Sequence, residues 1–149
     1  MSGILVGVDG SGHSRRALAW AIREAEQRNV PLTVLAVHPD QVRPATGIYW
    51  GLPEYAETGA DAEVARTAVR EFVDKVASEI GAANPEIHVT VITGDPAAEL
   101  VAASRDTDLV AVGSRGGGPV REFLMGSVSS KVALHAACPV VVIPADYEP

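Results

Sequence analysis

Apolar and β-branched residues gather in five short runs that are spaced along the chain as buried strands would be. Four of the runs are almost entirely apolar: Ile4–Val8, Leu32–Val37, Leu109–Val112 and Val140–Ile143. Such runs are expected in a parallel sheet that is covered on both faces, because neither side of the strand meets water. The fifth run, Ile87–Ile92, mixes in polar residues, and we expect it nearer to an edge of the sheet.

The segments between these runs carry apolar residues at the spacing of one helical face. The segment 14–28 has this spacing, and Asn29 and Pro31 follow it as stop signals. A longer helix is predicted from about residue 58 to residue 80, where Gly81 ends it. Its expected buried stripe consists of Val64, Ala65, Ala68, Phe72, Val73, Val76 and Ile80.

Two further helices complete a regular alternation of strands and helices. Asp95 is an N-cap residue followed by Pro96 at the first helical position, and the pair predicts a short helix through Arg105. A last helix is expected at about 127–137, before Pro139. The alternating order predicts an α/β fold, a single-domain doubly wound five-stranded parallel sheet with helices on both faces.

The size and composition of the chain suit one ordinary domain, spanning 1–149. Hydrophobic residues make up 47% of the chain, which excludes disorder over its whole length. No apolar run approaches the ~18 residues of a membrane span, so no membrane partner is expected. Asp9 interrupts the first apolar run and no basic residues precede it, which argues against a secretory signal. Cys138 is the single cysteine, which excludes an internal disulfide and favours a cytoplasmic location.

The charge balance argues against nucleic acid as a partner. Twelve basic and 19 acidic residues give a net charge of −7, which opposes attraction to a phosphate backbone. A small anionic ligand is still compatible with this charge where backbone dipoles outweigh the overall field.

Two segments interrupt the alternation and are candidates for function. The first, 39–58, is a long connection rich in proline, glycine and aromatic residues. It is either a variable surface flap or a lid over a ligand or partner. The second, 113–126, is rich in glycine and lies between a buried strand and a helix. Ligands of open parallel sheets bind beyond the carboxyl ends of the strands, so this second segment is well placed for binding.

Two standard nucleotide signatures do not fit the glycines. A Walker loop needs lysine directly after its last glycine, but Gly126 is followed by Ser127 and Val128. The dinucleotide fingerprint needs a third glycine where Arg15 stands, and an acid where the second strand ends in His38.

The glycine spacing Gly113-x2-Gly116-x9-Gly126-Ser127 resembles the motif of ATP-binding members of the universal stress protein family. The resemblance covers nearly the whole chain, from the opening strand with Asp9 to the closing segment. The resemblance implies a Rossmann-like fold of the adenine nucleotide alpha hydrolase-like type. It also implies ATP as the ligand, with or without Mg²⁺.

The resemblance assigns the base and sugar of the nucleotide to the ends of three strands. Asp9 matches the family acid near the adenosine, and Val37 matches a position whose backbone meets adenine. Val112 and Gly113 would lie beside the ribose, and Gly7 matches a small position beneath the ligand. Considered without the resemblance, Asp9 is as well explained as a turn or capping residue.

The same resemblance assigns the phosphates to the glycine-rich loop and the helix that follows it. Arg115 and Gly116 would approach the phosphates, although Arg115 alone is equally explained as a solvated side chain. The cradle would be closed by backbone amides and hydroxyls of Gly126, Ser127, Val128 and Ser129. This agrees with elementary physics, because amides at the start of a helix favour an anion.

These features predict a regulatory ATP-binding protein of the stress response and not a dedicated enzyme, with no catalytic residues and no metal site. No acidic pair is placed to hold Mg²⁺ and no lysine adjoins the loop, so only slow hydrolysis or self-phosphorylation is compatible. The alternatives are an ATP-pyrophosphatase-like adenylating enzyme and a family member that acts through protein contacts without nucleotide. A homodimer through the last strand, Val140–Ile143, is also expected, because an apolar edge strand favours pairing.

Overall fold

The computed structural model describes residues 3–38, 59–83, 85–115 and 125–149. Helices and strands alternate along the chain as the pattern predicts. Their order is β1 (Ile4–Val8), α1 (Gly12–Arg28), β2 (Leu32–His38), α2 (Gly59–Glu79), β3 (Ile87–Thr93), α3 (Pro96–Ala103), the 3₁₀ turn η1 (Ser104–Asp106), β4 (Leu109–Gly113), α4 (Ser127–His135) and β5 (Val140–Ile143).

The strands form one parallel sheet in the order β3-β2-β1-β4-β5. In the centre of the sheet, Ile4 of β1 pairs with Leu32 of β2 on one side and with Leu109 of β4 on the other. β3 and β5 form the two edges, which confirms the expectation that Ile87–Ile92 lies at an edge. The predicted doubly wound parallel fold is therefore confirmed.

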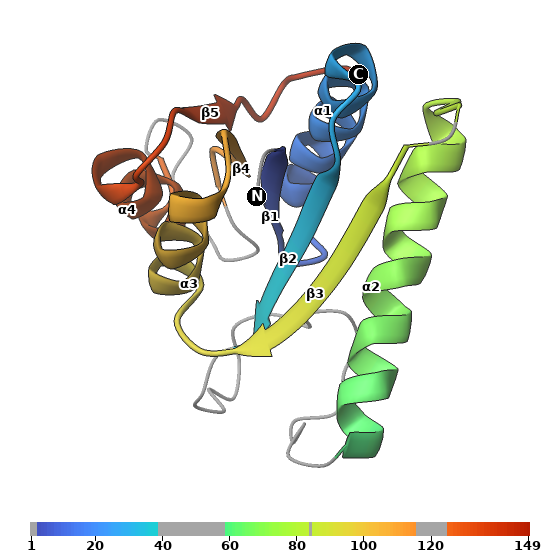
Figure 1. Cartoon of the computed structure of the whole chain (residues 1–149), viewed down its shortest axis with the longest axis horizontal. Helices are drawn as coiled ribbons and strands as arrows, with labels where there is room; N and C mark the ends of the chain where they lie inside the picture. The colour runs from blue at the N-terminus through green and yellow to red at the C-terminus, as the bar shows by residue number, and fades with distance from the viewer. Residues whose placement is uncertain (1–2, 39–58, 84, 116–124) are drawn as a thin grey trace.

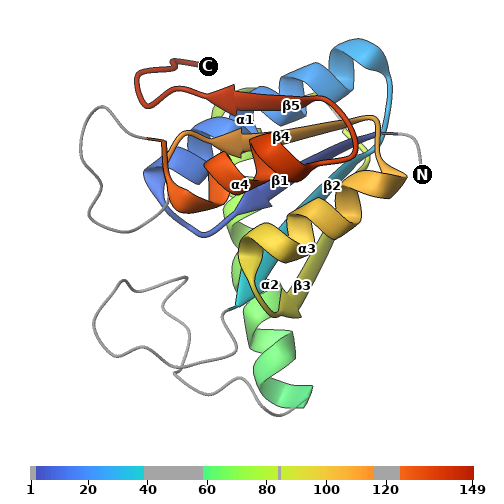
Figure 2. The same ribbon diagram turned by 90° about the vertical axis from the view of Figure 1, so that its left-hand side faces the viewer.

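The helices cover both faces of the sheet (Figures 1 and 2). One buried cluster joins the sheet to α1 and α2, with Leu18 and Val73 among its members. A second cluster joins the opposite face to α3 and α4 through Leu100 and Val132. Figure 2 shows α3 and α4 in front of the strands. The winding reverses between β1 and β4, because β1 leads into α1 on one face and β4 leads into α4 on the other.

The buried stripe of α2 differs from the predicted one at its start. Val64 has 52% of its surface exposed, whereas Val69 is completely buried beside Val73 and Val76. Each residue of a helix turns by about 100°, so Val64 points away from the face that Ala65 and Val69 share. The sequence prediction included Val64 because it is apolar, but its angular position decides its exposure.

Helix ends are set by capping groups at positions close to those predicted. α1 begins two residues before the predicted start, because the Ser11 side chain caps it and accepts a 3.2 Å hydrogen bond from the Ser14 amide. Asp95 caps α3 as predicted, by accepting from the Ala98 amide at 2.9 Å. The end of α3 tightens into η1, so the predicted helix through Arg105 is an α-helix followed by a 3₁₀ turn.

Candidate functional site

The starts of α1 and α4 both lie against the carboxyl end of β4. A Cβ built on Gly113 would lie 2.9 Å from the carbonyl oxygen of His13 in the first turn of α1. That distance is shorter than real Cβ contacts, so any side chain at residue 113 would push α1 away from the sheet. Glycine is therefore required here for packing, in addition to the ribose contact that the family resemblance implies.

The start of α4 is tied to the same strand end by a small set of hydrogen bonds. The Ser114 amide donates to the Ile143 carbonyl of β5 at 2.9 Å. The Ser114 carbonyl accepts from the Gly126 amide at 2.7 Å and lies 3.1 Å from the Ser129 hydroxyl. The Ser129 hydroxyl also lies 3.0 Å from the Gly126 carbonyl. These contacts hold the first turn of α4 in place directly beyond β4 and β5.

The first amides of α4 are the groups best suited to an anion. Gly126 is the N-cap and has no side chain to cap the helix, and the Ser130 amide makes the bond that closes the first turn, to the Gly126 carbonyl at 3.0 Å. The amides of Ser127, Val128 and Ser129 precede that bond, at the positive end of the helix dipole. The Ser129 hydroxyl is engaged with the Ser114 and Gly126 carbonyls, which takes it away from the phosphate role that the resemblance implies for it.

The turn after β1 has a different construction. Asp9 accepts a 2.9 Å hydrogen bond from the Ser11 amide, and Gly10 has a φ of 82°, which favours glycine. Asp9 therefore has the turn role that its sequence position allows, and it lies at the carboxyl end of β1 as a ligand-facing acid would. The family role of Asp9 near the adenosine stays a prediction.

The remaining predicted positions lie on one face of the central strands. Val37 and Val112 pack with the cluster beneath α3 and α4. A Cβ on Gly7 would come within 2.8 Å of Leu100 in α3. The absence of a side chain at Gly7 thus lets α3 approach the sheet, which is a packing reason for this glycine. Its assignment beneath the ligand stays a prediction, and Gly116 and the 39–58 connection lie outside the described residues.

The structure brings two basic residues of α1, His13 and Arg16, to the candidate site. The sequence analysis did not select either of them as a site residue. Burial, followed by the charges of Arg16 and Arg115, lowers the pKa of His13, whereas the charge of Asp9 raises it. Gly113 packs against the His13 carbonyl and the Arg16 guanidinium lies over the Gly12 carbonyl, so the start of α1 places both residues at the carboxyl edge of the sheet. The sequence signal for the two α1 residues is weak: they lie three positions apart in the first turn of a helix that follows a glycine-rich turn.

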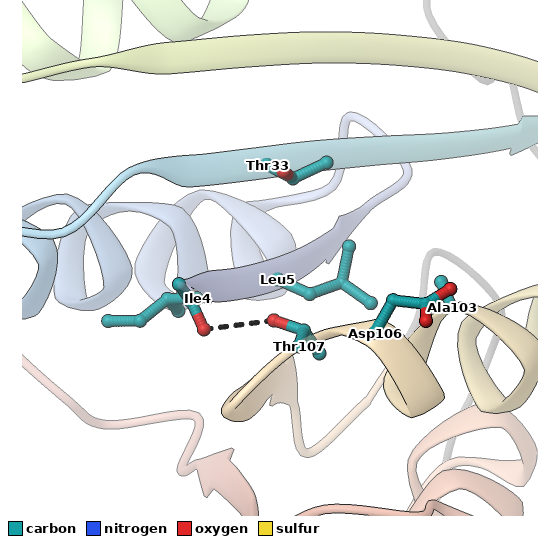
Figure 3. Close-up of a pocket in the computed structure, with 7 residues that line it drawn as sticks. Ile4, Leu5, Thr33, Ala103, Asp106 and Thr107 are labelled. Carbon is teal, nitrogen blue, oxygen red and sulfur yellow. Dashed lines mark hydrogen bonds between the residues drawn. The ribbon is translucent and has the colours of Figure 1, made fainter. Parts of the chain in front are cut away.

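A shallow depression of about 200 Å³ lies at the opposite edge of the sheet (Figure 3). It is lined at the amino ends of the strands by residues that include Leu5, Thr33 and Asp106. The Thr107 hydroxyl donates to the Gly3 carbonyl at 2.9 Å beside it. Ligands of open parallel sheets bind at the carboxyl edge, so this depression is not part of the candidate site.

The described ranges contain neither a membrane-spanning helix nor a cluster of metal ligands. Within residues 3–38, 59–83, 85–115 and 125–149, no helix is long and apolar enough to cross a membrane. The same ranges contain no group of three or more histidine, cysteine, aspartate or glutamate side chains that could hold a metal ion.

The fold and the site define a doubly wound α/β domain whose glycine-containing turns lie at the switch point between β1 and β4, the place where sheets of this kind form a ligand-binding crevice. The family model of the Universal stress protein family matches residues 1–144. The chain belongs to the universal stress protein family.

Relatives and solved structures support the same assignment. Universal stress protein Rv1996 of Mycobacterium tuberculosis is 35% identical over 99% of this chain, and Rv2005c of the same organism is 36% identical over 97%. The match covers 49% and 48% of these two proteins, so the chain spans about half the length of the curated relatives it matches.

Among solved structures, the universal stress protein UspA from Lactobacillus plantarum superposes with a TM-score of 0.75 at 28% identity. The match covers 95% of this chain and 97% of that one. A universal stress protein in complex with cAMP has a TM-score of 0.67 at 25% identity, with 95% and 96% of the two chains covered.

Proposed function

We propose that this chain is an ATP-binding regulatory domain. The observation that carries the proposal is the start of α4, where three amides lack a side-chain cap and hydrogen bonds anchor the first turn beyond β4. A universal stress protein of the same fold has been solved with cAMP, an adenine nucleotide, which supports a nucleotide as the ligand. Of the three functions considered from the sequence, this one fits both the family and the site.

The groups that would hold ATP surround the crevice between β1 and β4. The amides of Ser127–Ser129 would donate to phosphate oxygens, and the dipole of α4 would favour their charge. The apolar side chains of Val37 and Val112 lie at the ends of the flanking strands, on the side where the base and sugar would pack. Gly113 lets the chain pass close to α1 without a side chain in between.

We propose a regulatory role because the glycine-rich turns carry no lysine that could neutralise charge on a transferred phosphate. The two lysines of the chain, Lys75 and Lys131, lie within α2 and α4 and not in the glycine-rich turns. Fast phosphoryl transfer relies on groups that neutralise the charge developing on the transferred phosphate. We therefore expect bound ATP to act as a signal, with slow hydrolysis or self-phosphorylation at most. Binding of Mg²⁺ together with ATP and a cytoplasmic location stay predictions.

We also propose that two copies pair through β5. This strand is an edge of the sheet, and Val140, Val141 and Val142 are each only partly buried. Leu134 of the neighbouring helix α4 is 78% exposed. Pairing would satisfy the open strand edge and cover apolar surface, in a two-fold symmetric interface. Light scattering that gives the mass of a single 15.5 kDa chain at micromolar concentration would argue against this pairing.

The test of ATP binding has two parts. Mass spectrometry of the nucleotide released from denatured protein should identify ATP. In calorimetry, Gly126→Glu should weaken ATP binding by at least about a hundredfold, because it removes at least two charge-assisted hydrogen bonds of ~1.5–3 kcal/mol each. Ala133→Glu is the matched control, since it adds the same charge to an exposed position of the same helix. Equal ATP affinity in folded Gly126→Glu and in the parent protein would contradict the proposal.

A further inference from the structure

The start of α1 also lies beside the end of β4, because Gly113 packs against the His13 carbonyl. The start of α4 offers backbone amides, whereas at the start of α1 the Ser11 side chain already occupies the Ser14 amide. What α1 brings to the crevice is therefore its side chains. His13 and Arg16 are three positions apart in its first turn, so they lie on the same side of the helix.

Arg115 brings a third basic group to the same place from the other side of the crevice. It follows Gly113 by two residues, and Gly113 packs directly against the carbonyl of His13. The charges of Arg16 and Arg115 both lower the pKa of the His13 imidazole, which agrees with this placement. Asp9 is the one acidic neighbour of His13 in this group. The cluster thus has an excess of basic groups in a chain whose net charge is −7.

The imidazole of His13 has a buried nitrogen with unused bonding capacity. Its Nδ1 atom is inaccessible to solvent and has no hydrogen-bond partner. Most buried polar atoms in proteins are satisfied, so such an atom calls for an explanation. Arg16 lies beside it and donates from Nη1 to the Gly12 carbonyl at 3.3 Å, which holds the guanidinium over the first turn of α1.

We propose that His13, Arg16 and Arg115 form a subsite for the terminal phosphates of a nucleoside triphosphate, which makes the domain selective for ATP over AMP. This inference rests on the proposed function, because it concerns the same crevice. The α4 amides are sufficient for a single phosphate, and AMP would leave the basic cluster unused. A chain of three phosphates carries enough charge and enough oxygen acceptors to use both walls.

The test compares ATP with AMP in single variants by calorimetry. His13→Gln and Arg16→Gln should each weaken ATP binding about tenfold, the effect of losing one charge-assisted hydrogen bond. AMP binding should change by less than about twofold, so the ratio of the two affinities falls. Arg66→Gln on the exposed face of α2 removes the same charge far from the crevice and should leave both affinities unchanged.

The outcomes separate this inference from the proposed function. If the variants bind ATP and AMP with equally reduced affinity, the phosphate subsite is overturned but nucleotide binding stands. The same conclusion follows if both variants bind ATP as tightly as the parent protein. A parent protein that binds neither nucleotide would overturn the proposed function and the subsite together. As a second measurement, inorganic tripolyphosphate should displace ATP from the parent protein and do so about tenfold less effectively from Arg16→Gln. Equal displacement in the two proteins would also overturn the subsite.

Discussion

The starts of α1 and α4 flank the same crevice but are built for different tasks. α1 has a serine N-cap whose side chain satisfies one of its amides, and it projects basic side chains from its first turn. α4 has a glycine N-cap, so no N-cap side chain occupies its first amides, and the Ser129 hydroxyl ties its first turn to the Ser114 carbonyl. In the proposed site, α4 therefore contributes through its backbone and α1 through its side chains, because a side chain that caps an amide takes that amide away from a ligand.

The largest expected effect concerns the contact that holds the start of α1 against the end of β4. Gly113→Ala places a Cβ 2.9 Å from the His13 carbonyl, and backbone atoms cannot move aside cheaply. We expect a loss of about 2 kcal/mol in the free energy of unfolding, the usual size of an overpacking effect. Chemical denaturation measures this loss. The control is Gly12→Ala, whose Cβ would come no closer than 3.8 Å to the Arg16 side chain and should leave stability equal or slightly higher.

A second variant gives α4 the kind of cap that α1 has. Gly126→Ser is compatible with the backbone, because residue 126 has an extended conformation with φ of −63° and ψ of 159°. The new hydroxyl should bond to one of the first amides, raise stability by a few tenths of a kcal/mol and compete with phosphate. ATP binding should weaken about tenfold in calorimetry. Stronger ATP binding in this variant would show that the amides are not the phosphate ligands.

The reverse change removes the cap from α1. Ser11→Ala deletes the oxygen that accepts from the Ser14 amide at 3.2 Å. The free energy of unfolding should fall by about 1 kcal/mol, as for other N-caps. ATP affinity should stay within about twofold, because the α1 amides are not the proposed phosphate ligands. A tenfold loss of ATP affinity in the folded variant would mean that the backbone of α1 takes part in binding.

The smallest expected effect is a dependence of stability on pH through His13. Burial first, then Arg16 and Arg115, lower the pKa of His13 in the folded protein, so the unfolded chain binds more protons. The stability contributed by the neutral imidazole is therefore present above the unfolded pKa of 6.5 and is lost as the pH falls below it. Denaturation of the parent protein and of His13→Gln at about pH 7.5 and pH 5.5 should show a smaller acid loss in the variant.

ATP connects this pH effect to the proposed phosphate subsite. Phosphate oxygens near His13 would favour the protonated imidazole, so ATP should protect the parent protein more at the lower pH than it protects His13→Gln. His38 is a matched comparison, because burial lowers its pKa as well and its Nε2 is also buried without a partner. His38→Gln should reduce the acid loss but keep the extra protection by ATP. Loss of that protection in His38→Gln alone would place the phosphates elsewhere.

The sequence by itself determined the elements of this protein and the order in which they occur. Continuous apolar runs such as Ile4–Val8 form strands of a sheet covered on both faces, because a strand without a polar face must be buried on both sides. Local capping chemistry at Asp95 was equally readable, since an N-cap and its amide partner lie three residues apart. The glycine spacing was readable as well and led to the family.

Only the tertiary structure decided which residues share a place in space. Gly113 and His13 are one hundred positions apart in the chain and in contact in the fold, so no periodicity connects them. Gly7 is needed for packing because Leu100 of α3 lies directly above it. Val64 is exposed because of its angular position about α2. The basic cluster of His13, Arg16 and Arg115 exists because the winding reverses between β1 and β4. That reversal brings α1 and the end of β4 to one crevice, and long-range packing alone produces it.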